Sequence, residues 1–234
     1  MRKAHALVLA AGKGRRMQSD THKQFLTYRG EALFLCSVRV FLSCGIPVTV
    51  VTGEEDIPEI WRLLSEADLS KEAEGLPLPD VTAGGDVRYL SAYKGLQHLK
   101  ALGGAECVLI HDAARPFVTG EIVNAALESA LKYGAAAAAV MSKDTVKIAD
   151  SEGFVTDTPD RSRVYLIQTP QVFDFHKIID AYEKMLGSEE DLAGITDDAS
   201  VMERYGSCRV YLSPGSYGNV KITTPEDLEY LKEH

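Results

Sequence analysis

The sequence predicts an α/β protein with a mixed, mostly parallel sheet that is flanked by helices and carries a protruding β-arm. Over most of the 234 residues, short apolar runs typical of buried strands alternate with segments of helical periodicity. Alternation at such short spacing implies parallel strands that are joined by right-handed helical crossovers, which is a Rossmann-like arrangement. From about residue 142 to 165 the pattern changes to two β-prone runs around a turn, which indicates a hairpin.

The strand–helix alternation assigns each element in order as far as residue 141. Strands are expected at residues 6–9, 47–52, 81–83, 106–111 and 135–141, and helices at residues 32–42, 57–67, 88–102 and 121–133. Gly45 is a suitable stop for the first of these helices, and Pro58 occupies a tolerated first-turn position in the second. Beyond the hairpin we expect helices at residues 174–186 and 196–205, strands at 209–212 and 219–222, and a last helix from Thr224.

The hairpin has little apolar surface for its length. Its two runs, Thr145–Ile148 and Phe154–Thr156, flank the turn sequence Asp150-Ser-Glu-Gly153. Two isolated strands are marginal in water, so such an arm usually packs against another chain. We therefore expect one domain over residues 1–234, with an arm at about residues 142–165 that serves in dimerisation.

Net charge, cysteine spacing and the distribution of apolar residues exclude several classes of protein. A formal net charge of -9 argues against nucleic acid as a partner, because no basic face is available to neutralise a duplex. The four cysteines are scattered without metal-site spacing, so we interpret them as small buried hydrophobic residues. The segment before the first expected strand is short, so we expect no signal peptide, and no run of about 18 apolar residues occurs. We therefore expect a cytoplasmic protein that binds neither nucleic acid nor membranes.

A basic glycine-rich loop follows the first expected strand. Gly12 and Gly14 allow a ligand to approach the backbone amides, and Lys13, Arg15 and Arg16 add positive charge beside them. This combination favours an anionic ligand, most simply a polyphosphate. Neither the standard dinucleotide fingerprint nor the Gly-Lys-Ser/Thr phosphate loop is present, and a tight turn with solvated charges is an equal alternative.

Two further loops are expected at the same edge of the sheet, beyond the carboxyl ends of the strands, where such sheets bind ligands. In one loop, Asp112 is suited to hold Mg²⁺ or a ligand hydroxyl while Arg115 meets a phosphate. In the other, Gly84-Gly85-Asp86 allows close approach of the backbone before a helix. The structural alternatives are an Asp112 cap with a salt-bridged Arg115, and an Asp86 cap.

The remaining polar segments have ordinary structural explanations when taken alone. Residues 168–171 and 195–200 have the composition of turns and helix caps. Lys221 is explained equally well as a lysine that faces solvent on an edge strand. No Ser/His/Asp or Cys/His arrangement supports a protein nucleophile. The cations instead suggest catalysis at phosphorus by positioning and charge stabilisation.

Taken in order, the motifs resemble those of the 2-C-methyl-D-erythritol 4-phosphate cytidylyltransferases of the non-mevalonate isoprenoid pathway. The matching pieces run from residue 6 to residue 228: Ala10-Ala-Gly-Lys-Gly-Arg-Arg-Met17, Lys23-Gln-Phe25, Gly84-Gly-Asp-Val-Arg88, His111-Asp-Ala-Ala-Arg-Pro116, Asp144-Thr-Val-Lys147, Asp160-Arg-Ser162, Gln168-Thr-Pro-Gln171, Ile195-Thr-Asp-Asp-Ala-Ser200 and Asn219-Val-Lys-Ile-Thr-Thr-Pro-Glu-Asp-Leu228. One departure is Tyr89-Leu90, where the family usually has small or polar residues.

The resemblance implies CTP, Mg²⁺ and a sugar-alcohol phosphate as ligands, with pyrophosphate released by in-line attack at the α-phosphorus. It assigns the nucleotide to Ala10, Ala11, Gly12, Gly14, Gly85, Asp86, Ser91, Asp112 and Ala113, with Asp112 also a metal ligand. It implies that the charge developing at the α-phosphorus is stabilised by Arg16, Lys23 and Lys221. It implies that methylerythritol phosphate is bound by Arg115, Thr169, Thr196 and Lys221. It also implies a homodimer in which the arm of the partner contributes Thr145 and Arg161 to the site.

Two other functions remain open at this point. A ribitol-5-phosphate cytidylyltransferase would share the fold and several motifs, although Ala11-Gly12 and Ala113-Ala114 favour methylerythritol phosphate. A nucleotide-sensing module without catalysis is the other alternative. Three cations directed at one phosphorus would be superfluous in such a module, which favours the enzyme.

Overall fold

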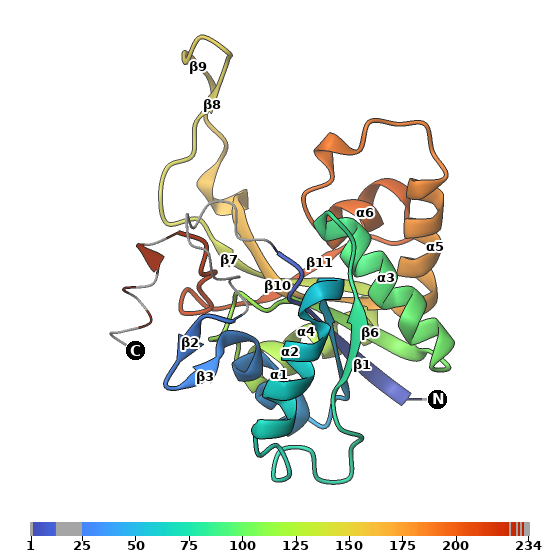
Figure 1. Ribbon diagram of the computed structural model, residues 1–234. Coiled ribbons are helices and arrows are strands. Elements are labelled where there is room, and N and C mark those ends of the chain that lie inside the picture. The colour runs from blue at the N-terminus through green and yellow to red at the C-terminus, as the bar shows by residue number, and fades with distance from the viewer. Residues whose placement is uncertain (1, 13–24, 225, 228, 230, 232–234) are drawn as a thin grey trace.

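The computed structural model describes the chain except for residues 1, 13–24, 225, 228, 230 and 232–234 (Figure 1). Its centre is a seven-stranded sheet with the order β11-β7-β10-β6-β1-β4-β5. The strands are β1 (Arg2–Leu9), β4 (Val48–Thr52), β5 (Asp80–Ala83), β6 (Ala105–Asp112), β7 (Ala135–Met141), β10 (Tyr165–Asp174) and β11 (Tyr211–Pro214). Neighbouring strands are parallel except that β10 runs antiparallel to both β6 and β7. The predicted mixed, mostly parallel sheet is confirmed.

The register brings the loops after β1 and β6 together. Leu9 at the end of β1 pairs with Asp112 at the end of β6. Past the sheet, the Ala113 amide donates to the Leu9 carbonyl at 3.0 Å, and the Ala10 amide donates to the Val51 carbonyl at 2.7 Å. The carboxyl ends of β1, β4 and β6 therefore form one edge from which the candidate loops emerge.

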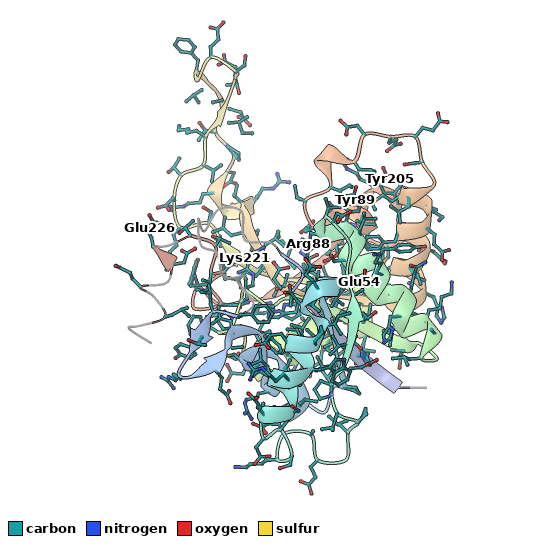
Figure 2. All side chains as sticks on the ribbon, viewed as in Figure 1. Glu54, Arg88, Tyr89, Tyr205, Lys221 and Glu226 are labelled. Carbon is teal, nitrogen blue, oxygen red and sulfur yellow. The ribbon has the colours of Figure 1, made fainter. Side chains whose placement is uncertain are left out.

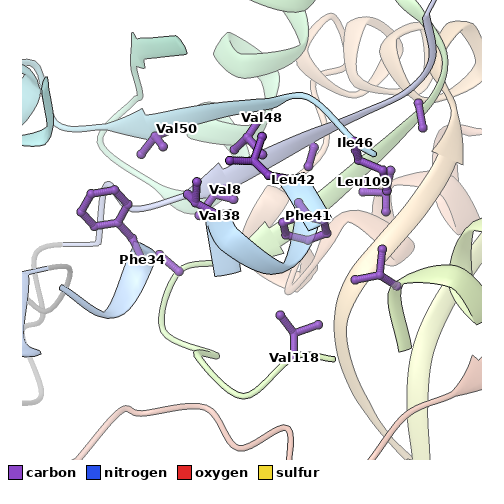
Figure 3. Close-up of a cluster of buried hydrophobic side chains, with 14 of the residues drawn as sticks. Val8, Phe34, Val38, Phe41, Leu42, Ile46, Val48, Val50, Leu109 and Val118 are labelled. Atoms are coloured by element: carbon purple, nitrogen blue, oxygen red, sulfur yellow. The ribbon is translucent and has the colours of Figure 1, made fainter. Parts of the chain in front are cut away.

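Helices cover both faces of the sheet because alternate strand residues point in opposite directions. The helices are α1 (Leu33–Ser43), α2 (Ile57–Glu66), α3 (Arg88–Ala101), α4 (Gly120–Tyr133), α5 (Phe175–Leu186) and α6 (Asp198–Tyr205). In β1, Ala6 and Val8 join the core beneath α1, α2 and α4, part of which Figure 3 shows. Leu7 and Leu9 join a second core beneath α3, α5 and α6.

Short elements complete the described chain. They are β2 (Thr27–Tyr28) with β3 (Glu31–Ala32), β8 (Ile148–Ala149) with β9 (Val155–Asp157), and the 3₁₀ turns Glu54–Asp56, Arg161–Arg163 and Leu192–Gly194. The β8–β9 hairpin stands away from the rest of the molecule (Figure 1), and its expected position in the sequence is confirmed. None of the described helices has the length and apolar composition needed to cross a bilayer.

Two sequence expectations were wrong. Residues 168–171 lie inside β10 rather than in a turn, because the strand continues through a register shift between Ile167 and Gln171. Residues 219–222 form no strand; instead the segment lies against the loop after β6, where the Ile222 amide donates to the Ala114 carbonyl at 2.8 Å. The last predicted helix falls partly on residues outside those described.

Candidate active site

A buried carboxylate at the end of β6 is the centre of the candidate site. Lys221 Nζ donates to Asp112 Oδ2 at 2.6 Å, and Arg88 Nε donates to Asp112 Oδ1 at 3.2 Å. Figure 2 labels both cations in the middle of the molecule. Burial alone would raise the pKa of Asp112, but Arg88 and then Lys221 outweigh burial, so the net pKa lies well below the usual range. Asp112 is therefore a fully ionised anion at neutral pH.

Arg88 links Asp112 to a second buried carboxylate. Its Nη2 donates to Asp198 Oδ2 at 2.8 Å, and the Tyr182 hydroxyl donates to Asp198 Oδ1 at 2.6 Å. Burial works against the charge of Arg88, but Asp198 and Asp112 outweigh it and hold the pKa of the guanidinium well above its ordinary value. The result is a chain of hydrogen bonds from α5 through α6 and α3 to the end of β6.

His111 organises the other side of Asp112. Its Nε2 lies 3.2 Å from the Arg115 carbonyl and 3.1 Å from Ser37 Oγ, and its Nδ1 lies 3.0 Å from Thr169 Oγ1. A carbonyl oxygen accepts only, so Nε2 carries the proton and Nδ1 accepts from the Thr169 hydroxyl. Burial lowers the pKa of His111 to about 4, which keeps the ring neutral.

Thr169 is consequently an acceptor toward any ligand. Its hydroxyl proton is directed at His111, while its oxygen also accepts the Asp112 amide at 3.1 Å. Thr169 thus has a lone pair left but no proton to donate, which suits a ligand hydroxyl better than a phosphate oxygen. Asn219 supports this arrangement by donating to the Thr169 carbonyl at 2.9 Å.

Arg115 is a cation without a carboxylate partner among the described residues. Its Nη1 donates to the Asn219 carbonyl at 2.7 Å, while its buried Nε meets no acceptor in the described part of the chain. Burial lowers the pKa of the guanidinium from its ordinary value, and the charge of Asp112 offsets only part of that shift. A neighbouring anion would therefore be stabilised here.

The loop after β5 is tightly packed where the glycines occur. A Cβ on Gly85 would lie 2.5 Å from the Leu90 Cβ, and one on Gly84 would lie 2.8 Å from Ser91 Oγ and 3.0 Å from the Ala11 Cβ. Ser91 Oγ in turn accepts the Gly85 amide at 3.1 Å. Gly84 therefore lets this loop lie against Ala11 of the loop after β1, and Gly85 lets it pack against the start of α3.

The start of α6 is fixed to β10. Asp197 caps the helix, and its Oδ2 accepts from Gln171 Nε2 at 2.7 Å, while Gln171 Oε1 accepts the Ala199 amide at 2.8 Å. Thr196 precedes the cap and is exposed. The predicted helix cap is confirmed, and Gln171 is what holds it beside the sheet.

Many of the predicted site residues gather at one edge of the sheet. The group comprises Ala10, Ala11, Gly85, Ser91, Asp112, Ala113, Arg115, Thr169 and Lys221. Asp86, Gly12 and Thr196 are exposed on the adjoining loops. No hydrogen bond joins Thr145 or Arg161 to this group within the described residues; Arg161 Nη1 donates to the Lys143 carbonyl instead. Gly14, Arg16 and Lys23 lie outside the described residues.

The structural alternatives for single residues do not hold. Asp112 is paired with Arg88 and Lys221 rather than with Arg115, and Lys221 is not on a strand. The cap of α3 is Val87, with no side-chain hydrogen bond from Asp86. The sequence did not reveal that Arg88 pairs with both Asp112 and Asp198, although Arg88 and Asp198 lie within motifs that carry the family resemblance.

Comparison with known proteins identifies the family of this chain. Residues 4–232 match the family model described as 2-C-methyl-D-erythritol 4-phosphate cytidylyltransferase. The chain is 42% identical to the protein of that name from Clostridium botulinum (strain Eklund 17B / Type B), with 97% of each chain covered. It is 36% identical to that from Lachnoclostridium phytofermentans, with 100% of this chain and 98% of the relative covered.

Solved structures give the same result. The chain is similar to 4-diphosphocytidyl-2C-methyl-D-erythritol synthase from Anaerococcus prevotii, with a TM-score of 0.83, 32% identity, and 99% and 95% of the two chains covered. It is also similar to the 2-C-methyl-D-erythritol 4-phosphate cytidylyltransferase from Thermus thermophilus, with a TM-score of 0.72, 27% identity, and 99% and 98% covered. The chain therefore belongs to the 2-C-methyl-D-erythritol 4-phosphate cytidylyltransferase family.

Proposed function

We propose that the edge of the sheet around Asp112 is where this protein joins CTP to 2-C-methyl-D-erythritol 4-phosphate. The activity is that of the family and yields 4-diphosphocytidyl-2-C-methyl-D-erythritol and pyrophosphate. The observation that carries the proposed location is the convergence of Asp112, Lys221 and Arg115 where β6 ends. One anion and several cations at a strand end are what a reaction between two phosphates requires.

The two substrates would occupy opposite sides of Asp112. CTP would lie along Ala10, Ala11, Gly12 and Gly14, with Gly85, Asp86, Ser91, Asp112 and Ala113 at its base and ribose. The methylerythritol phosphate would lie toward Arg115 and Thr196. Arg115 suits its phosphate because the guanidinium has no carboxylate partner among the described residues, and Thr169 suits a hydroxyl because it can only accept.

The chemistry would be an in-line displacement in which the substrates supply the reacting groups. An oxygen of the methylerythritol phosphate attacks the α-phosphorus, the new P–O bond forms, and the bond to the bridging oxygen of the leaving pyrophosphate breaks. Lys221 stabilises the charge that develops there, together with Arg16 and Lys23. The protein then acts by positioning and electrostatics, without a covalent intermediate.

Mg²⁺ fits this site only together with the triphosphate. Among the described residues, no three His, Cys, Asp or Glu side chains gather as an all-protein metal site would need. Asp112 would be the protein ligand, in agreement with the preference of Mg²⁺ for one or two carboxylates plus substrate phosphates. When bound, the ion would neutralise charge on the triphosphate.

We further propose that the β8–β9 arm builds a homodimer and completes the partner's site with Thr145 and Arg161. The support is the exposure of apolar side chains on a hairpin that stands away from the molecule: Ile148, Phe154 and Val155, with Phe154 69% exposed. A hairpin of this size gains little stability alone. We also propose a cytoplasmic location, which the free thiols of Cys36, Cys44 and Cys208 support.

Substitution of Lys221 tests the proposed location. Lys221→Ala should lower kcat by about 100-fold or more, while the Kd for CTP measured by calorimetry changes little, because the ammonium acts on charge that exists only in the transition state. The matched control is Lys100→Ala, which removes an exposed lysine paired with Glu183. Equal loss of kcat in both variants, or an unchanged kcat in Lys221→Ala, would contradict the proposal.

A further inference from the structure

Asp198 is a fully buried carboxylate that no substrate assignment uses. It is the first residue of α6, its side chain is 0% exposed, and its two oxygens are satisfied by two other elements. Tyr182 on α5 binds one oxygen, and Arg88 on α3 binds the other. A buried carboxylate is tolerated only when it is paired and hydrogen-bonded, so these contacts fix its position.

Arg88 stands between two carboxylates that come from different parts of the site. Asp112 ends β6, whereas Asp198 begins the helix that follows Thr196. The guanidinium is a rigid planar fork, so its Nε and Nη2 cannot follow two carboxylates independently. A displacement of Asp198 therefore turns Arg88 and moves the hydrogen bond on Asp112.

Tyr182 fixes the other end of this chain. Its side chain is fully buried in the core beneath α3, α5 and α6, and its ring stacks on Tyr93 of α3 with centroids 6.0 Å apart. Burial raises the pKa of the Tyr182 hydroxyl, and Asp198 raises it further, so the group stays a donor at neutral pH. Tyr182 thus anchors Asp198 to the core.

We propose that Asp198, anchored by Tyr182, is a positioning residue that sets the orientation of Arg88 and so aligns the second-substrate segment at Thr196 with Asp112. This inference rests on the proposed function. The effect should be larger on the second substrate than on CTP for two reasons. When Arg88 turns, Asp112 keeps its shorter hydrogen bond from Lys221, at 2.6 Å on the other carboxylate oxygen. The hydrogen bonds between Ser91 and Gly85, which shape the proposed base pocket, do not involve the guanidinium. Loss of Asp198 should therefore weaken the second substrate and leave CTP binding almost unchanged.

The chain of contacts also predicts that Tyr182 acts only through Asp198. The Tyr182 hydroxyl donates its hydrogen bond to Asp198. Removing that hydroxyl should matter when Asp198 is a carboxylate and matter little when its charge has already been removed. The two effects should then be non-additive, as for residues in one network.

The test compares Asp198→Asn, Tyr182→Phe and the double variant with the full-length wild type. The KM for methylerythritol phosphate should rise about ten-fold in Asp198→Asn, as expected for loss of a hydrogen bond between charged groups. Tyr182→Phe should raise it in the same direction, and the double variant should match Asp198→Asn. The Kd for CTP, measured by calorimetry with Mg²⁺, should change by less than about two-fold.

Matched controls separate positioning from general stability. Glu72→Gln removes the charge of a carboxylate that pairs with Arg39 away from the site. Tyr205→Phe removes a tyrosine hydroxyl from α6, the helix that Asp198 begins, where that hydroxyl donates to Glu190. Both should keep the wild-type KM even where thermal stability falls. Tyr182→Phe retains the packed ring, so it still decides the question if Asp198→Asn does not fold.

Two kinds of failure are distinguishable. If the wild type turns over but both variants keep its KM, or if the Kd for CTP rises as much as the KM, Asp198 is only a structural ion-pair partner and the inference is overturned. Fully additive effects of the two substitutions would overturn the role of Tyr182 as anchor. Absence of turnover by the wild type itself, with CTP still bound, would instead overturn the proposed function and this inference with it.

Discussion

His111 makes the folding of this protein depend on pH in a defined direction. In the folded state its pKa lies at about 4, against the ordinary 6.5, because the ring is buried between Thr169 and the Arg115 carbonyl. Between these values the unfolded chain holds a proton that the folded protein does not. The free energy of unfolding therefore falls as the pH drops from about 6.5 toward 4.

The size of this effect follows from the two pKa values. Each pH unit of the gap corresponds to about 1.4 kcal/mol, so lowering the pH from 7.5 to 5.0 should remove about 2 kcal/mol through His111 alone. Replacement by glutamine in His111→Gln retains a donor for the Arg115 carbonyl and removes the titrating group. The variant should be less stable at pH 7.5 but should lose about 2 kcal/mol less than the wild type on acidification.

Urea unfolding followed by circular dichroism at pH 7.5, 6.5, 5.5 and 5.0 measures this difference. The matched control is His176→Gln, which replaces an exposed histidine on α5 and should keep the wild-type pH dependence. If the free energy of unfolding falls by the same amount in His111→Gln and in the wild type over this range, the claim that buried His111 is neutral is refuted. The tautomer that makes Thr169 an acceptor would lose its basis at the same time.

Two other predictions concern the loop after β5 and the arm. Gly85→Ala should weaken CTP binding about ten-fold, because the added Cβ would lie 2.5 Å from the Leu90 Cβ; Gly120→Ala, whose Cβ meets the nearest atom at 3.4 Å, should leave the Kd unchanged in the same calorimetric assay. Co-expression of the inactive variants Arg161→Ala and Asp112→Asn should restore roughly a quarter of wild-type activity, since half of the dimers would carry one intact site. A mixture as inactive as its components would refute completion of the site by the arm.

The fold was predictable where burial dictates the periodicity of the sequence. The runs at β1, β4 and β6 are continuous and apolar, and α1 and α4 show helical spacing, so their types and order followed from local pattern alone. Strand β10 was not predicted because Gln168 and Pro170 interrupt its apolar residues, and a proline argues against a central strand. The strand accommodates this interruption by its register shift.

Single site residues were predictable, but their partners were not. Asp112 and Arg115 stand out because a charged pair follows a buried strand. The contacts of Arg88, in contrast, join residues that lie 24 and 110 positions away in the sequence. Lys221 shows the same limit: its own segment suggested an edge strand facing solvent, whereas the fold brings it to Asp112 across 109 positions.

Cytidylyl transfer at Asp112 is tested most directly by measuring pyrophosphate release from CTP in the presence of Mg²⁺, with methylerythritol phosphate and ribitol 5-phosphate supplied in parallel. We expect turnover with methylerythritol phosphate and none with ribitol 5-phosphate at equal concentration. Turnover with ribitol 5-phosphate alone would contradict the substrate while leaving the chemistry at Asp112 intact. Absence of turnover with both, from folded protein that binds CTP, would contradict cytidylyl transfer at Asp112.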